Sequence, residues 1–409
     1  MNTAEVRPDV IILGGGLVGM TLAVALDTHG IASIVIDPAD PAVTLAPAFD
    51  GRASAVASAS GRMLGAIGVG ARLAGKGCAI AAIRVSDGLE PGRLDFVPDV
   101  ESGALGTMYE NRVLRRALFE AASEAPRVDL RMKTRATSVT RSPGGVVATL
   151  DDGTTVSAPL LVAAEGRNSP TREAAGIAVA RWRYEHAAIV GAFHHERPHE
   201  NTAFEIFYPA GPFALLPLPD DEAGHRSAIV WTVAGADAAG MLKLGDRGFL
   251  AEASKRMGGF LGALSAPSSR ASYPLGFHHA ARVTAERLVL VGDAGHGIHP
   301  IAGQGLNLGF RDVATLAQVL VEGKRLGLDP GDAALLDRYQ RWRGVDTLMV
   351  AAATDTLTRL FGVPGRAASA VRRFGVSAVN AIPPLKDRFM AEARGEAGDL
   401  PKLLQGVPV

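Results

Sequence analysis

The sequence predicts an α/β fold of two domains followed by a helical C-terminal region. Three observations support this prediction. The chain begins with a short apolar strand, a glycine-rich turn and an apolar helix; two internal stretches have strand-like periodicity; and the residues beyond 312 read mostly as helices. A chain of 409 residues also exceeds the size at which one hydrophobic core usually keeps growing, so a second domain or an inserted module is expected.

The first element is a βαβ unit of the kind that binds a dinucleotide. Residues 9–13 read as a buried parallel strand, and the turn that follows places Gly14, Gly16 and Gly19 in the G-x-G-x-x-G spacing. These glycines let backbone N–H groups approach a pyrophosphate, and Asp37, at the end of the second strand, can accept hydrogen bonds from a ribose diol. An acid at this position disfavours a 2′-phosphate. The pattern therefore indicates FAD or NAD rather than NADP.

The middle of the chain reads as strands around one clear helix. Periodicity is strand-like over residues 80–100 and 187–233, which predicts a β-rich substrate domain assembled from separated segments. Between them, NRVLRRALFEAASEA is an amphipathic helix. The stretch VVATLDDGTTVSAPLLVAA predicts a hairpin on a DDG turn, followed by a buried strand.

A second strand, turn and helix occur late in the chain, as LVLVGDAGHGIHPIAGQGLNLGFRD at residues 288–312. This stretch lacks the G-x-G-x-x-G spacing, so we expect a function other than binding a second dinucleotide. It contains an acid, Asp293, and two histidines, His296 and His299. Two histidines without a third ligand make a poor zinc site, so no metal is expected, and they either position the loop or move protons. From this string alone, a plain helix start remains an alternative.

Composition excludes several classes of protein. Lysine plus arginine (42) balance aspartate plus glutamate (42), so no global field attracts nucleic acid, and membrane contact would require a local patch. The single cysteine, Cys78, excludes an internal disulfide and a thiolate metal cluster. The N-terminus has no signal-peptide pattern, and no uncharged apolar stretch approaches the roughly 18 residues of a membrane-spanning helix. We therefore expect a cytoplasmic protein.

Three motifs in order resemble one known family. GGGLVG, LLVAAEGRNSPTR and GDAGHGIHPIAGQGLNLGFRD are similar to the single-component FAD-dependent aromatic hydroxylases of the para-hydroxybenzoate hydroxylase type. The strings DGRASAVA, GPFALLPLPD and NAIPPLKDRFM most resemble the UbiH/UbiF/VisC group of ubiquinone-biosynthesis hydroxylases, and the similarity runs nearly end to end. The resemblance implies a Rossmann-like FAD-binding domain with an inserted β-rich substrate domain. We expect the FAD-binding domain at 1–80, 101–182 and 275–345, the substrate domain at 81–100 and 183–274, and the helical region at 346–409.

The same resemblance implies a single FAD site made by both turns. The first turn is implied to hold the adenosine and pyrophosphate through Gly14, Gly16, Leu17, Val18, Gly19 and Asp37. Asp293 is implied to bind the ribityl or pyrophosphate side, and the helix start, with its positive dipole end, to face the pyrimidine edge of the flavin through Gly303, Gly305, Leu306 and Asn307. Further implied FAD contacts are Arg52, Arg112 and Glu165, the last in place of the family's usual aspartate. The implied catalytic loop at the flavin edge is His299, Pro300, Gly303 and Gln304.

The implied reaction is hydroxylation of the aromatic ring of a polyprenylphenol intermediate in ubiquinone biosynthesis, with O₂, through a flavin C4a-hydroperoxide. NAD(P)H or a protein electron donor would reduce the flavin, and the sequence leaves this choice open. Two alternatives also stay open. One is an FAD-dependent reductase or oxidase of a prenyl lipid or another small aromatic molecule, and the other is a catalytically silent FAD-binding subunit of a quinone-synthesis complex.

An insoluble polyprenylated substrate implies contact with a membrane surface. Residues 366–394 mix apolar and basic side chains, which is typical of an interfacial helix on the inner face of a membrane. A tail helix packed on the protein, with its basic side in solvent, fits the same pattern. Other quinone-biosynthesis proteins are candidate partners, and nucleic acid is not expected.

Overall fold

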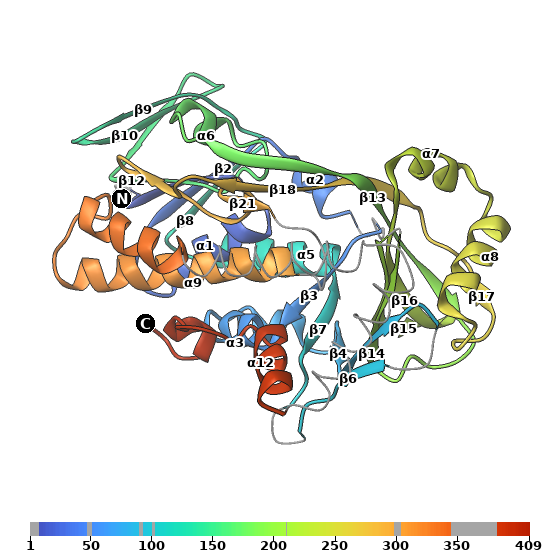
Figure 1. The fold of residues 1–409 in the computed structure, drawn as a ribbon. Coiled ribbons are helices and arrows are strands. Elements are labelled where there is room, and N and C mark those ends of the chain that lie inside the picture. Colours follow the sequence, from blue (N-terminus) through green and yellow to red (C-terminus); the bar gives the residue numbers. More distant parts are fainter. Residues whose placement is uncertain are drawn as a thin grey trace.

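The computed structural model describes residues 8–46, 51–89, 93–99, 103–209, 211–297, 304–344 and 383–409. Two large sheets lie side by side in it (Figure 1). They are joined by two long strands, β13 (Val179–His195) and β18 (Ala271–Ala280), which run from the left part of the view to the right part, below β9 and β10. The expected α/β class is confirmed.

The first sheet has six strands, and five of them are parallel. Its order is β19 (Thr284–Ala285), β20 (Leu288–Leu290), β12 (Leu160–Ala163), β1 (Val10–Leu13), β2 (Ser33–Asp37) and β8 (Val128–Met132). β1 and β12 are buried along their whole length, as expected for strands that are covered on both faces. Because β20, β12 and β1 are parallel neighbours, the three segments that follow them emerge at the same edge of the sheet. Those segments are the three motifs singled out in the sequence.

Helices and a small sheet cover this first sheet (Figure 1). The helices α1 (Leu17–Asp27) and α9 (Gln304–Arg325) pack against each other below it, next to α5 (Asn111–Glu124). Above it lies an antiparallel sheet of β9 (Ala136–Ser142), β10 (Gly145–Leu150) and β11 (Thr155–Ala158). The hairpin and the amphipathic helix read from the sequence are therefore both present.

The second sheet has nine strands and two unlike faces. Its path is β21 (His296–Gly297), β18, β13, β16 (Gly224–Ala234), β15 (Gly211–Asp221), β14 (Thr202–Tyr208), β5 (Ala82–Asp87) and β6 (Arg93–Phe96), with β17 (Leu264–Ser265) beside β13. The outer face packs through Phe193, Phe213 and Trp231 against α7 (Gly235–Lys243) and α8 (Asp246–Met257). The inner face turns toward the first sheet.

Smaller elements complete the described chain. A third antiparallel sheet contains β3 (Ala53–Ala57), β7 (Gly106–Glu110) and β4 (Cys78–Ile80). The short helices are α2 (Pro41–Thr44), α3 (Ser58–Ala66), α4 (Gly70–Leu73), α6 (Pro170–Ala174), η2 (Gly292–Ala294) and η4 (Lys402–Gln405), and the C-terminal part adds helical residues 333–344 and α12 (Pro383–Ala393). The expected boundaries at 182/183 and 274/275 fall inside β13 and β18. Each of these strands therefore runs without a break from one expected domain into the other. The boundaries themselves stay a prediction.

Candidate active site

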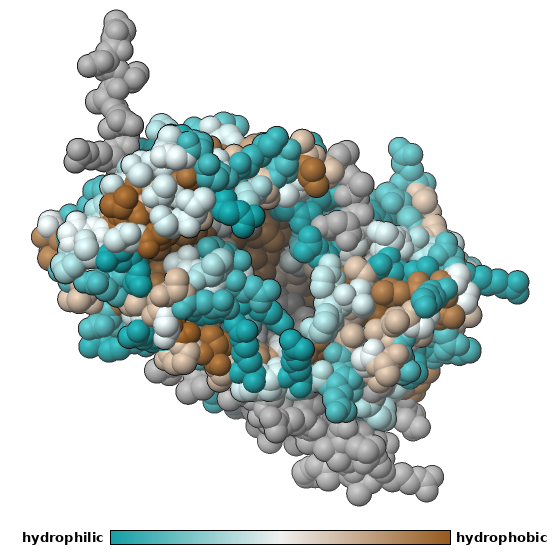
Figure 2. Space-filling view, turned by 90° about the horizontal axis from the view of Figure 1, so that it is seen from above, coloured by the Kyte–Doolittle hydropathy of each residue, from teal (hydrophilic) through white to brown (hydrophobic). Residues whose placement is uncertain are grey.

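A cavity of about 960 Å³ lies between the carboxyl edge of the six-stranded sheet and the inner face of the nine-stranded sheet. Figure 2 shows a hollow near the middle of one face of the molecule, with apolar surface inside it and hydrophilic surface at its rim. We call one side of the cavity the loop wall; its lining residues are 16–18, 51–55, 111, 164, 166–168, 291, 293, 305 and 306. The other side, called the sheet wall, consists of the lining residues of β13, β14, β15, β16 and β18.

The three glycines of the first turn have different roles. Gly14 has a φ of +107°, and a Cβ there would lie 2.4 Å from the carbonyl oxygen of Ala164. A Cβ at Gly19 would lie 1.9 Å from the carbonyl oxygen of Gly14. These two glycines therefore let the turn pack against β12 and against α1. At Gly16, by contrast, no atom lies within 4 Å of a built Cβ, so this glycine leaves free space in the cavity.

The start of α1 fits the diphosphate of a dinucleotide. Gly16 is its N-cap and supplies no side-chain acceptor, so the first N–H groups of the helix carry their partial positive charge toward the cavity. Asp37 lies at the end of β2 on the same edge, where it accepts hydrogen bonds from the backbone N–H groups of Gly15 (2.5 Å) and Ala39 (2.7 Å). The turn is thus held in shape from within, and its free donors point to where an anionic group would bind.

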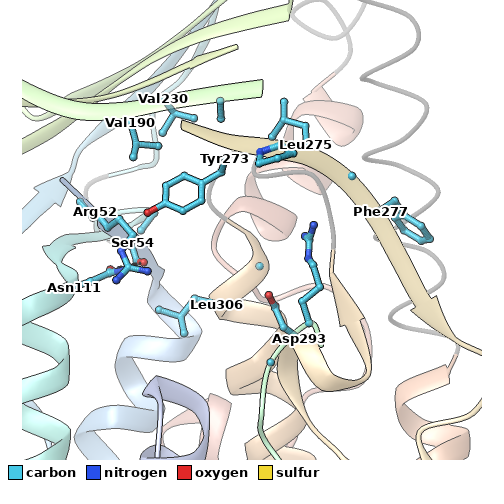
Figure 3. Close-up of a pocket in the computed structure, with 18 of the residues that line it drawn as sticks. Arg52, Ser54, Asn111, Val190, Val230, Tyr273, Leu275, Phe277, Asp293 and Leu306 are labelled. Atoms are coloured by element: carbon cyan, nitrogen blue, oxygen red, sulfur yellow. Dashed lines mark hydrogen bonds between the residues drawn. The ribbon is translucent and has the colours of Figure 1, made fainter. Parts of the chain in front are cut away.

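Asp293 projects from the late turn into the cavity, below Tyr273 in Figure 3. The enclosing protein raises the pKa of Asp293 above its usual range, while His296 and Arg167 act in the opposite direction. The ring of His278 lies behind it, with Nε2 2.8 Å from the backbone oxygen of Asp293. Burial lowers the pKa of His278 to about 4, so at neutral pH this ring is uncharged and donates a hydrogen bond that fixes the turn.

A buried charged group anchors the late turn from behind. The carboxylate of Asp312, on α9, accepts hydrogen bonds from the backbone N–H of Gly292 (2.8 Å), from Nε2 of His296 (2.7 Å) and from Nε of Arg343 (2.6 Å). The partners keep the pKa of Asp312 below its usual range despite complete burial. His296 is only 3% exposed and is bonded to this carboxylate, which favours the positioning role over proton chemistry. Sequence reasoning missed Arg343, because it lies in a helix some 30 residues further along the chain.

Side chains from separate motifs connect the two turns. Val18 packs against both Gly292 and Gly309, where a Cβ would lie 3.2 Å and 2.7 Å from its methyl groups. Arg172 is fully buried and donates to the backbone oxygens of Ala294 (2.9 Å) and Arg167 (3.0 Å). The first, middle and late motifs therefore lie together at one cavity. That a single FAD spans both turns, as the resemblance implied, stays a prediction.

The other expected FAD contacts divide into two sets. Residues that line the cavity are Gly16, Leu17, Val18, Arg52, Asp293, Gly305 and Leu306. The side chains of three more interact with other protein groups. Arg112 forms an ion pair with Glu110, and Glu165 accepts hydrogen bonds from the hydroxyl of Ser169 and the N–H of Thr171. Asn307 forms hydrogen bonds with the backbone of Ala55 and Ala57. These bonds shape the site's borders. A direct contact of these three with FAD stays a prediction.

Part of the expected flavin-edge loop cannot be placed. His299, Pro300 and Gly303 lie outside the described residues, as does the side chain of Gln304, whose backbone begins α9. Most of the tail at residues 366–394 also lies outside them. In the described part, Phe389 on α12 is 40% exposed and its ring lies 6.3 Å from that of Phe96. Within the described chain, no helix is both long and apolar enough to cross a membrane.

Two residues of the sheet wall, Tyr273 and Glu205, were not among the site residues expected from the sequence. Tyr273 projects from β18 toward Arg52 and Ser54, with Val190 and Val230 nearby (Figure 3). Glu205 on β14 also lines this wall. Successive side chains of a strand point to opposite faces, so Glu205 faces away from Phe204 and Ile206. The sequence alone does not say which of the two faces lines the cavity.

The model of one protein family, described as an FAD binding domain, matches residues 7–352 of this chain. The chain belongs to this family. FAD is therefore its cofactor, and the space at Gly16, the uncapped start of α1 and the cavity-facing Asp293 fit that cofactor.

Relatives extend the match over the whole chain. The chain is 45% identical to the ubiquinone hydroxylase UbiL of Rhodospirillum rubrum, over 100% of this chain and 95% of that protein. It is 32% identical to the 3-demethoxyubiquinol 3-hydroxylase of Escherichia coli, over 95% of this chain and 98% of that one. The solved structure of the p-nitrophenol 4-monooxygenase PnpA from Pseudomonas putida superposes with a TM-score of 0.79 at 18% identity, over 96% and 99% of the two chains. The expected family and fold are confirmed, and so is the expected enzyme class, an FAD-dependent monooxygenase.

Proposed function

We propose that this protein hydroxylates the aromatic ring of a polyprenylphenol precursor of ubiquinone, using O₂ and FAD. One observation carries the proposal: the FAD-fitting loop wall and a large apolar wall enclose the same cavity. A resident cofactor and an aromatic substrate can therefore lie against each other. The names of the relatives from Rhodospirillum rubrum and Escherichia coli support a quinone precursor as the substrate.

Each wall has a chemical task in this proposal. FAD, when bound, supplies the two-electron and oxygen chemistry that protein side chains lack. The N-termini of α1 and α9 would hold the cofactor: the N–H groups and partial positive charge at α1 would face its diphosphate, and those at α9 would face the pyrimidine edge, where reduction adds negative charge. Apolar side chains on the sheet wall, among them Val190, Ala214 and Val230, exclude water from the ring of the substrate. The residues held by Asp312 keep the late turn in place during turnover.

The remaining elements of the proposal concern the surroundings of the enzyme. NAD(P)H or a protein donor would reduce the flavin. The substrate carries a long isoprenoid tail, so we propose that the enzyme works at the cytoplasmic face of a membrane, together with other proteins of quinone synthesis. The basic and apolar residues of α12, which include Lys386, Arg388 and Phe389, support this location.

Isotope labelling tests the proposed reaction. The FAD-loaded protein is reduced and then supplied with a short-chain prenylphenol and ¹⁸O₂. We expect one ¹⁸O atom in the ring hydroxyl of the product, measured by mass spectrometry, and no product without oxygen. Turnover of the phenol without oxygen, or oxygen consumption that yields only hydrogen peroxide, would exclude a hydroxylase.

A further inference from the structure

Glu205 is an acid on an otherwise largely apolar surface. It lies in the middle of β14. The strand register places Glu205, Ala214, Val230 and Val190 in one row across four neighbouring strands. All four residues line the cavity. Among the described residues of the sheet wall, Glu205 is the only carboxylic acid.

The described part of the fold does not account for this acid. Glu205 is 9% exposed. No hydrogen bond or ion pair joins its carboxyl group to any of the described residues, and burial alone shifts its pKa. Burial raises the pKa of Glu205 to about 7. The protein pairs its other buried acids: Glu110 binds Arg226 at 2.7 Å, and Asp312 binds Arg343 and His296. An unpaired buried carboxyl group destabilises a fold, so its presence on the wall of a cavity points to a partner that arrives with a ligand.

We propose that Glu205 binds the ring hydroxyl of the aromatic substrate and thereby selects the ring carbon that faces the flavin. The proposal rests on the function proposed above. The hydroxyl donates a hydrogen bond to the carboxylate, and the ring lies against Ala214 and Val230. An apolar wall alone lets a ring rotate in its plane, since dispersion contacts have little direction. One directional bond at Glu205 removes that freedom and presents a single ring edge to the loop wall.

Other charged and titratable groups face the same space and share in its electrostatics. Those that line the cavity are Arg52, Arg167, Arg181, Arg183, Tyr273, His278 and Asp293. The neighbouring strand β5 carries Arg84 and Asp87, β14 itself ends with Tyr208, and β15 has no titratable residue before Asp220. The test must therefore change the hydroxyl of the ligand as well as the protein.

Paired ligands supply this test. 2-Prenylphenol and its methyl ether are titrated into the FAD-loaded protein at pH 8, and binding is followed by the change in flavin absorbance. We expect the wild-type protein to bind the phenol about tenfold or more tightly than the ether. In Glu205→Leu this preference falls to within about twofold, with unchanged flavin content. Glu205→Gln restores part of it, because the amide oxygen still accepts a hydrogen bond.

A matched control and a second readout separate this role from a structural one. Glu185→Gln repeats the glutamate-to-glutamine change of Glu205→Gln at an exposed position of β13. This variant should keep the full preference for the phenol over its methyl ether. Hydroxylation by the wild-type protein should give one ring isomer, and Glu205→Leu a mixture. Equal binding of both ligands by the wild type, or an unchanged preference in Glu205→Leu, overturns the proposal. If the wild type prefers the phenol but adds no ¹⁸O, the proposed function fails while the assignment of Glu205 stands.

Discussion

The loop wall and the sheet wall of the cavity are built in opposite ways. Behind the loop wall, buried polar groups have partners within the protein: Asp37 accepts a hydrogen bond from the backbone N–H of Gly15, and Asp312 accepts hydrogen bonds from Gly292 and His296. On the sheet wall, the Oγ1 atom of Thr232 has no hydrogen-bond partner among the described residues. The carboxyl group of Glu205 has no charged or hydrogen-bonding partner among them either. The loop wall is thus pre-organised for a cofactor that stays, whereas the sheet wall leaves hydrogen bonds to be completed by a substrate that comes and goes.

This difference predicts opposite effects on stability. A substitution that breaks the internal bonding of the loop wall should destabilise the protein. Replacing an unpaired polar group on the sheet wall with a neutral or apolar one should stabilise it and impair function, since sites that bind ligands carry unsatisfied groups at a cost to the fold.

The largest effect is expected at Gly14. Its backbone is left-handed, and a valine Cβ would clash with the backbone oxygen of Ala164, which cannot move without displacing β12. We expect Gly14→Val to lose more than about 4 kcal/mol of stability and to purify, if at all, without its yellow colour. Flavin absorbance per mole of protein and the melting temperature measure both effects. A yellow variant with wild-type melting would show that this turn is not packed as described.

Gly16→Ala is the control for that experiment, because it probes the same turn without the clash. Gly16 has a φ of −74°, and a Cβ there meets nothing within 4 Å. The apo protein should melt within about 1 °C of the wild type, since a surface change of this kind alters stability little. FAD should bind at least about tenfold more weakly, because the methyl group occupies the approach to the first N–H groups of α1.

A smaller loss of stability is expected at Asp312. Asp312→Asn removes the charge that balances the buried Arg343, and breaking a buried pair in this way typically costs about 3 to 5 kcal/mol. Urea unfolding of the FAD-loaded protein measures the loss. The control is Asp329→Asn in the partly exposed pair with Arg287, for which about 1 kcal/mol or less is expected. Similar losses in both variants would mean that the late turn does not depend on its buried anchor.

The sequence predicted the first turn well because that turn is local. The spacing of Gly14, Gly16 and Gly19 and the acid at Asp37 describe one βαβ unit, whose parts are close in the chain as well as in space. The α/β class, the amphipathic helix of α5 and the hairpin before β12 followed from periodicity for the same reason.

The sequence could not supply the features that depend on distant contacts. The role of Asp312 requires Arg343, and the space at Gly16 is visible only once β12 lies beside β1 and β20 beside β12. Alternation along β14 does not distinguish a cavity-facing side chain at Glu205 from a solvent-facing one. The packing of α7 and α8 on the other face makes its side the cavity side.

The third prediction concerns the sheet wall, where a substitution should raise the stability of the protein instead of lowering it. The pKa of Glu205 is about 7 in the folded protein against an ordinary value of 4.5, so the folded state binds this proton more tightly than the unfolded chain does. The contribution of Glu205 to stability is therefore most favourable below pH 4.5, and about 3 kcal/mol of it is lost as the pH rises from 4.5 through 7. Glu205→Gln cannot titrate. At pH 8 we expect it to be more stable than the wild type by about that amount, and at pH 5 by less than about 1 kcal/mol.

Thr232→Val separates titration from the mere loss of an unpaired polar atom. Thr232 is 4% exposed, lines the same cavity from the inner face of the sheet, and its hydroxyl lacks a partner among the described residues. Its replacement should stabilise the FAD-loaded protein by about 1 kcal/mol or less, by the same amount at pH 5 and pH 8, because no proton is involved. Melting curves of both variants across this pH range provide the comparison. If Glu205→Gln shows the same pH-independent gain as Thr232→Val, then Glu205 is ionised at little cost, and the sheet wall holds a charge partner for it already.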